Sequence, residues 1–71
     1  MAVETADISS SNLSSASYDS ETSELTIEFN NGSTYLYSNV PQGVWAGLKA
    51  TGSPGSYFHN SIKPRFRFEQ Q

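Results

Sequence analysis

The chain of 71 residues is short and acidic, with a formal net charge of −3, 13% aromatic residues and no cysteine. A chain of this length has room for one domain, whose core supplies only a few kcal/mol of net stability. The lack of cysteine excludes disulfides and thiolate metal sites, so the packing of four Phe, four Tyr and one Trp must stabilise the fold.

Charge is unevenly distributed along the sequence. Residues 1–30 carry six acidic residues and no basic one, whereas residues 31–71 carry four basic residues and one acidic residue. The negative balance argues against tight non-specific binding to phosphates, because that affinity comes mainly from cationic side chains that displace counterions. This argument concerns the whole protein and does not apply to a local basic patch near the C-terminal end.

The first residues of the chain show neither a basic nor a hydrophobic leader, and no apolar run approaches the roughly 20 residues that cross a bilayer. We therefore expect a cytoplasmic protein without a membrane partner. Residues 1–9 are small, polar and acidic without apolar periodicity. They predict a flexible N-terminal arm, followed by a single domain at residues 10–71.

Three antiparallel strands are predicted, at about residues 12–18, 24–30 and 33–38. The first has modest strand propensity because it is rich in serine. In the second, Leu25, Ile27 and Phe29 alternate with polar residues, and a turn signal ending at Gly32 follows. The second and third strands therefore form a hairpin around which the fold is organised.

The loop of this hairpin allows two registers. A two-residue turn ending at Gly32 pairs Ile27 with Leu36, which places Tyr35 and Tyr37 on the opposite face, available for binding. A three-residue loop with Gly32 in a left-handed bulge instead pairs Ile27 with Tyr35 and places both tyrosines largely in the core. Both loops need glycine for the same conformational reason, so the sequence leaves the register open.

Two short helices are predicted to cover the sheet, at about residues 41–50 and 54–62. Pro41 suits the first position of one helix, and Trp45 is its expected anchor. Gly43 and Gly47 each cost about 1 kcal/mol relative to alanine, so this helix needs tertiary contacts, and its small residues would permit close approach to the sheet. In the second helix, Phe58 and Ile62 share one face.

The C-terminal tail alternates two arginines with two phenylalanines. This pattern suits a fourth strand at the sheet edge, with Phe66 and Phe68 inward and Arg65 and Arg67 outward. The predicted fold class is therefore α+β. A three-stranded antiparallel sheet, with the C-terminal strand as an optional fourth, is covered on one face by two short helices in the order βββαα(β).

Two groups of residues are candidate binding sites. Tyr35 and Tyr37 can stack single-stranded bases, at about 1–3 kcal/mol per base, or can pack beneath the helices. A basic group interleaves with aromatic residues as in nucleic-acid-binding strips, or forms a solvated edge that prevents sheet-to-sheet pairing. Its members are His59, Lys63, Arg65 and Arg67.

Catalytic and cofactor chemistry finds little support in the sequence. A Ser-His-acid arrangement would have to use the single His59, and nothing marks its partners. One histidine and scattered carboxylates give no metal-ligand spacing. The segment 52–56 has anion-binding character but lacks P-loop spacing, and capping with a tight turn explains it better. We expect no catalytic residue, no metal site and no cofactor.

A series of spaced residues extends across most of the chain. Its members are Tyr18-Asp19, Leu25-x-Ile27-x-Phe29, Gly32, Tyr35-x-Tyr37, Val40-Pro41, Leu48, Ser53-x-Gly55-x-Tyr57-Phe58 and Ile62-Lys63. The series resembles the KTSC domain family from about Ser10 to Phe66. Any one of these positions is weak evidence for the family. The resemblance is specific because many spaced positions match the family pattern at once.

The resemblance implies a short module without established activity, which occurs at the C-terminus of some lysyl-tRNA synthetases and in small bacterial and phage proteins. Because the domain occurs in the same chain as a lysyl-tRNA synthetase in some proteins, RNA binding is the function that the resemblance implies. The family's Y-x-Y motif corresponds to Tyr35 and Tyr37, and its I-K motif to Ile62 and Lys63. The chain departs from the family pattern at Phe66, where tyrosine is common, and in its acidic N-terminal half.

We therefore expect a small non-enzymatic binding module, for which two hypotheses remain. In the first, RNA or single-stranded nucleic acid binds through the tyrosine pair and the basic group. In the second, an exposed aromatic patch or an edge strand docks another protein or a second copy of the chain. The family context favours the first hypothesis, and the acidic N-terminal half favours the second.

Overall fold

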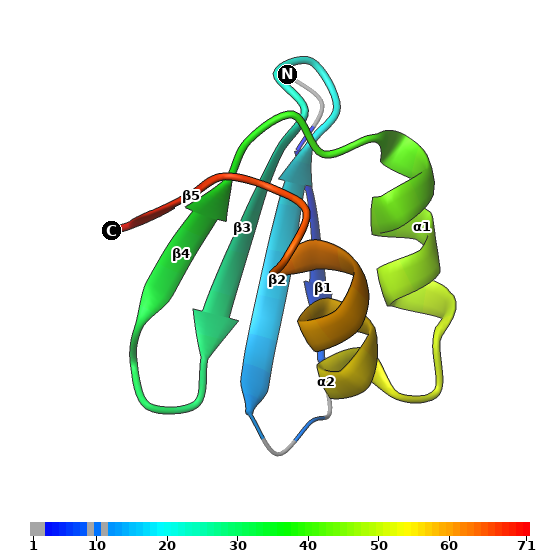
Figure 1. The fold of residues 1–71 in the computed structure, drawn as a ribbon. Coiled ribbons are helices and arrows are strands. Elements are labelled where there is room, and N and C mark those ends of the chain that lie inside the picture. Colours follow the sequence, from blue (N-terminus) through cyan, green and yellow to red (C-terminus); the bar gives the residue numbers. More distant parts are fainter. Residues whose placement is uncertain (1–2, 9, 11) are drawn as a thin grey trace.

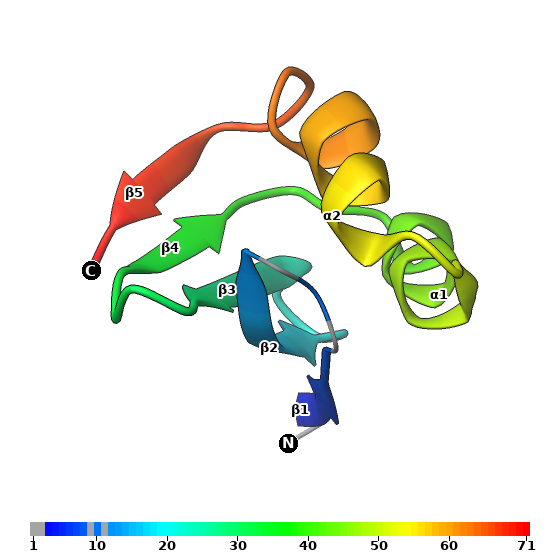
Figure 2. The same cartoon turned by 90° about the horizontal axis from the view of Figure 1, so that it is seen from below.

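The structure is a computed structural model that describes residues 3–8, 10 and 12–71. Five antiparallel strands form one curved sheet in the order β1-β2-β3-β4-β5, and the helices lie together on one side of it (Figures 1 and 2). The strands are β1 (Val3–Asp7), β2 (Leu13–Asp19), β3 (Glu24–Phe29), β4 (Thr34–Tyr37) and β5 (Phe68–Gln70). The helices are α1 (Gln42–Ala50) and α2 (Pro54–Tyr57), and α2 continues as a π-helical turn over Phe58–Ile62.

The α+β class and the two covering helices agree with the sequence prediction, but the sheet has five strands rather than three or four. The additional strand is β1, which lies in the segment predicted to be a flexible arm. It pairs with β2 along its whole length, from Val3 opposite Asp19 to Asp7 opposite Ser15. Residues 1, 2 and 9 of the predicted arm lie outside the described part of the chain. The sequence did not predict β1 because this strand is held by backbone pairing with another strand. Such pairing does not require alternating apolar residues, so it produces no pattern in the sequence.

The C-terminal strand is present, but it starts later than predicted. β5 covers only Phe68–Gln70, so Arg65, Phe66 and Arg67 precede it and do not alternate across the sheet. Phe66 is half-buried against the core, whereas Phe68 keeps 54% of its surface exposed. The chain leaves β4, forms both helices over one face and returns to pair with β4 (Figure 2).

The β3–β4 hairpin adopts the three-residue loop. Ile27 pairs with Tyr35, and the Phe29 N–H donates to the Ser33 carbonyl oxygen at 2.8 Å. Gly32 has a φ of 91°, in the left-handed region that favours glycine. Because side chains alternate along a strand, this register turns Tyr35 and Tyr37 toward the helices rather than away from them.

A bulge in β2 aligns the core-facing residues of that strand. The pairing with β3 shifts between Leu13 and Ser15, which brings Leu13 to the same face as Ala16 and Tyr18. The Tyr18 hydroxyl donates to the Val40 carbonyl oxygen at 2.6 Å. The buried apolar side chains form one core between sheet and helices: Leu13, Ala16, Tyr18, Leu25, Ile27, Tyr37, Val40, Trp45, Leu48, Phe58 and Ile62.

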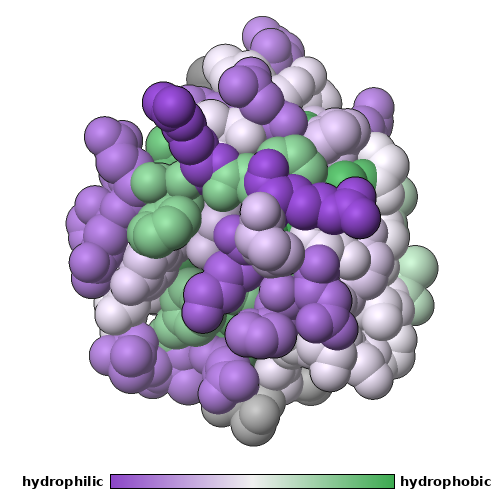
Figure 3. All heavy atoms as spheres, viewed as in Figure 1, coloured by the Kyte–Doolittle hydropathy of each residue, from purple (hydrophilic) through white to green (hydrophobic). Residues whose placement is uncertain are grey.

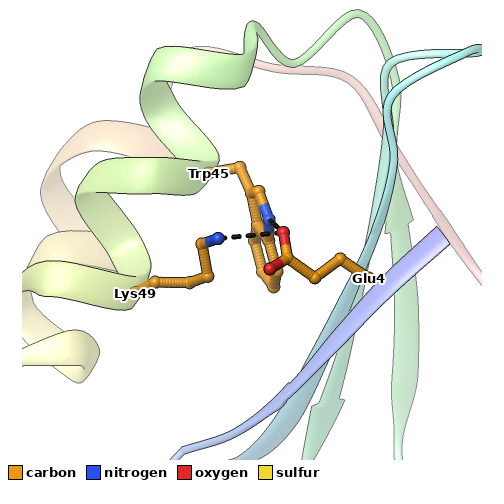
Figure 4. A network of polar contacts seen from close by, with 3 residues as sticks. All are labelled: Glu4, Trp45 and Lys49. Atoms are coloured by element: carbon orange, nitrogen blue, oxygen red, sulfur yellow. Dashed lines mark hydrogen bonds and ion pairs between the residues drawn. The ribbon is translucent and has the colours of Figure 1, made fainter. Parts of the chain in front are cut away.

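Trp45 anchors helix α1, as predicted, and it also attaches β1. Its ring is 2% exposed and stacks on Tyr18, with the centroids 5.7 Å apart. Its indole N–H donates to Glu4 Oε1 at 2.7 Å, and Lys49 Nζ reaches the same oxygen at 2.9 Å (Figure 4). These hydrogen bonds from Lys49 and Trp45 hold the pKa of the Glu4 carboxyl below its ordinary value of 4.5.

The glycines of α1 do not approach the sheet as the sequence predicted. A Cβ atom at Gly47 would lie 2.2 Å from the Tyr57 hydroxyl oxygen, whereas one at Gly43 would meet nothing within 4 Å. The Tyr57 hydroxyl donates to the Val44 carbonyl oxygen at 3.3 Å. Gly47 therefore permits the contact between α1 and α2, which places the second helix over the hairpin.

We expect Gly47→Ala to destabilise the protein by about 1–3 kcal/mol, because the added methyl group overlaps the Tyr57 ring. Gly43→Ala is the matched control, which we expect to be neutral or stabilising by up to about 1 kcal/mol through helix propensity alone. Urea unfolding followed by circular dichroism measures both. Equal stabilities for the two variants would show that the α1–α2 contact does not require glycine.

Protonation of Glu4 should loosen β1 at low pH. Because the folded-state pKa is lowered, the stabilisation is fully present above 4.5 and is lost as pH falls through the folded-state pKa. The indole N–H resonance of Trp45 reports this step directly by NMR. We expect it to titrate with a midpoint below 4.5 in the wild-type protein, to stop titrating in Glu4→Gln and to be unchanged in Asp7→Asn. An indole titration that persists in Glu4→Gln would contradict the assignment.

Candidate functional site

Five aromatic rings from β3, β4, β5 and the second helix form a closed circuit. Neighbouring ring centroids lie 5.3 to 5.6 Å apart, with edge-to-face or tilted geometry throughout. In order around the circuit, the rings belong to Phe29, Tyr35, Phe68, Tyr37 and Phe58. They line a hollow of about 310 Å³, which we call the aromatic pocket.

Polar residues complete the lining of the aromatic pocket. Asn31 and Ser33 contribute from the hairpin loop, and Lys63 contributes from the end of the second helix. Lys63 is exposed and makes no ion pair with a described residue. In the space-filling view, apolar surface is visible between the hairpin and α2, with hydrophilic side chains around it (Figure 3). The pocket therefore combines aromatic surface with a free cation.

Two further hollows lie along the second helix. A hollow of about 300 Å³ shares Phe29, Asn31, Phe58 and Lys63 with the aromatic pocket. A hollow of about 560 Å³ next to Ser53 shares His59 with this second hollow. We call these three neighbouring hollows the helix groove.

Charge is segregated between the two sides of the sheet. Among the described residues, no Asp or Glu lines the helix groove, although the protein is acidic overall. No Lys or Arg occurs in any of the five described strands. Strand alternation places five of the seven carboxylates on the sheet face opposite the helices. They are Asp7, Asp19, Glu24, Glu28 and Glu69.

The structure brings together four of the six residues that the sequence singled out. Tyr35 and Lys63 line the aromatic pocket, Tyr37 is at its buried side, and His59 lines the adjoining hollows. Tyr37 is 2% exposed, so little of its ring is available for stacking in this structure, whereas Tyr35 is half-buried.

Arg65 and Arg67 lie outside the helix groove. Both residues are exposed on the segment between the second helix and β5, and Arg67 lines a separate hollow beside Phe68. They are near the aromatic pocket along the chain but do not form its lining.

Sequence reasoning missed most of the pocket, although its residues were noted for other reasons. The sequence analysis placed Phe29 in a strand, Phe58 on one face of the second helix and Phe68 on the inner side of an edge strand. The available signal was the excess of aromatic residues on two adjacent strands and the second helix. Only the hairpin register and the return of β5 beside β4 bring these residues into one circuit.

Within the described residues, no group of three or more His, Cys, Asp or Glu side chains is placed to hold a metal ion. Neither helix in the described part of the chain has the length and apolar character needed to cross a membrane.

Comparison with known proteins identifies relatives across most of the chain. The family model for the KTSC domain matches residues 9–66. The crystal structure of a KTSC domain protein from Yersinia pestis superposes with a TM-score of 0.89, with 31% sequence identity, and the match covers 99% of each chain. β1 and β5 lie entirely beyond the family match, yet the superposition with the crystal structure includes nearly the whole chain.

Curated relatives include both large and small proteins. The lysine–tRNA ligases of Trichormus variabilis and Nostoc punctiforme are 47% and 46% identical, over 75% and 76% of this chain. The chain spans only 9% and 10% of the length of these two ligases. A protein of Tsukamurella paurometabola is 40% identical, and the match covers 84% of this chain and 90% of that protein.

The ionisation of Tyr37 tests the burial of the aromatic circuit. Burial, with Tyr35 nearby as a smaller cause, raises the pKa of the Tyr37 hydroxyl to about 12. The unfolded chain ionises this group near its ordinary value of 10, so folding stability should fall as pH rises from 10 toward 12. We expect Tyr37→Phe to reduce this loss, measured by urea unfolding across the range, and Tyr35→Phe to reduce it less. An unchanged loss in Tyr37→Phe would contradict the burial of the Tyr37 hydroxyl.

Proposed function

This chain belongs to the KTSC domain family, and we propose that it is a small binding module whose helix groove binds single-stranded RNA or DNA. The observation that carries the proposal is the composition of the groove. In a protein with a net charge of −3, the described lining of this groove includes Lys63 and His59 and no carboxylate. A negatively charged ligand is therefore repelled less on this side of the molecule than on the acidic sheet face.

Aromatic surface beside a cation favours nucleic acid over other anions. Proteins that bind single strands combine a positively charged groove with rings on which bases stack. Phe68, which is 54% exposed, and Tyr35, which is half-buried, offer ring surface next to Lys63. Arg65 and Arg67 continue the positive charge beyond the pocket. The proposed role is binding, without catalysis.

The relatives favour RNA among single strands. A lysine–tRNA ligase acts on an RNA, as its name states, and this chain matches a small part of two such enzymes. With only Lys63, Arg65 and Arg67 near the pocket, the electrostatic part of the affinity is modest. Binding is therefore expected at low salt and should weaken as salt rises.

A second candidate function is supported by the charge segregation itself. The sheet face opposite the helices presents five carboxylates, while the cations lie on the helix side and the C-terminal segment. Such a bipolar surface suits docking of a basic protein or self-association of two copies through complementary faces. This function would not require the aromatic pocket.

We expect labelled single-stranded RNA and DNA to bind the protein at low salt in fluorescence anisotropy titrations. Lys63→Gln should weaken binding and flatten the plot of log affinity against log salt by about 0.7, the contribution of one phosphate contact on a single strand. Lys49→Gln is the matched control, because Lys49 pairs with Glu4 outside the groove, and it should change neither quantity.

The absence of a complex with either nucleic acid at low salt would reject this function. A light-scattering mass of a dimer or larger under the same conditions, falling to a monomer at high salt, would then support the second candidate. Equal effects of the two lysine substitutions would show that binding is not located in the helix groove.

A further inference from the structure

We propose that the aromatic pocket holds one unstacked uracil or thymine base of the bound strand. This inference rests on the proposed function and adds to it a base preference and a residue that sets this preference. It follows from the size of the pocket, from its ring-lined walls and from the hydrogen-bonding groups that remain unused at its rim.

The dimensions of the pocket admit one flat base. Its volume of about 310 Å³ is near the lower limit of cavities that take small ligands. Aromatic rings line it, so a planar ligand can make stacked or edge-to-face contacts. Phe68, on the short edge strand β5, keeps 54% of its surface exposed and so offers ring surface to an entering base.

The hydrogen-bonding state of Asn31 is fixed by the hairpin loop. The Ser33 backbone N–H donates to Asn31 Oδ1 at 3.0 Å, and a donor can be accepted only by the amide oxygen. The NH₂ group of this side chain makes no hydrogen bond with a described residue, and it can only donate. Asn31 lines both the aromatic pocket and the adjoining hollow.

Lys63 adds donors to the pocket, because an ammonium group carries three donors and no acceptor. The Ser33 carbonyl oxygen already accepts the Phe29 N–H, which leaves its hydroxyl. The hydroxyls of Ser33 and Tyr37 can each donate or accept, so they do not disfavour an acceptor on the ligand. Because the Asn31 NH₂ group and Lys63 can only donate, a ligand that pairs with these two groups must present acceptors.

Bases differ in the groups that they present to such a donor-rich pocket. Uracil and thymine place a carbonyl oxygen at the position where cytosine and adenine carry an amino group, and an amino group there would face these donors. Guanine also has a carbonyl oxygen at this position, but it adds an amino group and a second ring. Uracil and thymine therefore fit the donors of the aromatic pocket best.

The test compares oligo(dT), oligo(dA) and oligo(dC) of equal length by fluorescence anisotropy at low salt. We expect oligo(dT) to bind about tenfold more tightly than the other two, the discrimination expected of a well-matched base contact. The decisive variant is Asn31→Asp, which keeps the oxygen that accepts the Ser33 N–H and replaces the amide donor with an acceptor. It should abolish the preference for oligo(dT), leaving affinities for the three strands within about twofold of one another.

The added negative charge of Asn31→Asp will also weaken all binding, so a control must carry the same charge. Asn60→Asp places it at the far end of the helix groove, where Asn60 is exposed and lines only the largest of the three hollows. We expect uniform weakening with the preference for oligo(dT) retained. An unchanged thermal unfolding midpoint in both variants confirms that the hairpin is intact.

The outcomes separate the two proposals. If the three oligonucleotides bind with equal affinity to the wild-type protein, or if Asn31→Asp retains the preference, the proposal of a base-selective pocket is wrong. The proposal that the helix groove binds single strands is not affected by this result. If none of the three binds, both proposals fall.

Discussion

The left-handed backbone at Gly32 is the constraint on which the rest of the molecule depends. It closes a three-residue loop, and this loop sets Leu25 opposite Tyr37 and Ile27 opposite Tyr35. A register shifted by one residue would turn both tyrosines to the other face of the sheet. The aromatic circuit would then lose two of its five rings, and the core would lose Tyr37.

The second constraint is the close approach of the two helices at Gly47. Because the Tyr57 ring occupies the space that a side chain at Gly47 would need, α2 lies directly beside α1 and continues over the end of the hairpin. The π-helical turn over Phe58–Ile62 buries Phe58 and Ile62 and leaves Lys63 at the rim of the aromatic pocket. Helix packing therefore determines where the cation of the groove is placed.

Charge segregation is the property of this fold on which the proposed binding function depends. The strands place carboxylates on one face of the sheet, and the helices cover the other face without adding a carboxylate to the described part of the groove. An acidic protein thereby keeps a surface that is compatible with anions. Net charge is a poor guide to partners in such a case, because the field near the ligand depends on which groups face it.

The sequence predicted the central strands and both helices because their signals are local. Alternation marked β3, the turn signal marked the hairpin, and the Phe58/Ile62 spacing marked the second helix. The strand β1 depends on pairing with β2 and on the bond between Glu4 and Trp45, which are 41 residues apart. The aromatic pocket likewise depends on long-range pairing of β4 with β5, and no local pattern encodes it. The resemblance to the KTSC family, confirmed by the family match, covered the fold but not the pocket.

Chemical-shift mapping with a single-stranded oligonucleotide tests the central claim most directly, because it locates the ligand on the molecule. We expect the largest amide shifts at Asn31, Ser33, His59 and Lys63, which line the helix groove. Strand residues on the opposite sheet face, such as Thr26 and Glu28, should be unaffected. Shifts concentrated on that acidic face, or none at saturating oligonucleotide, would contradict the assignment of the groove as the binding site.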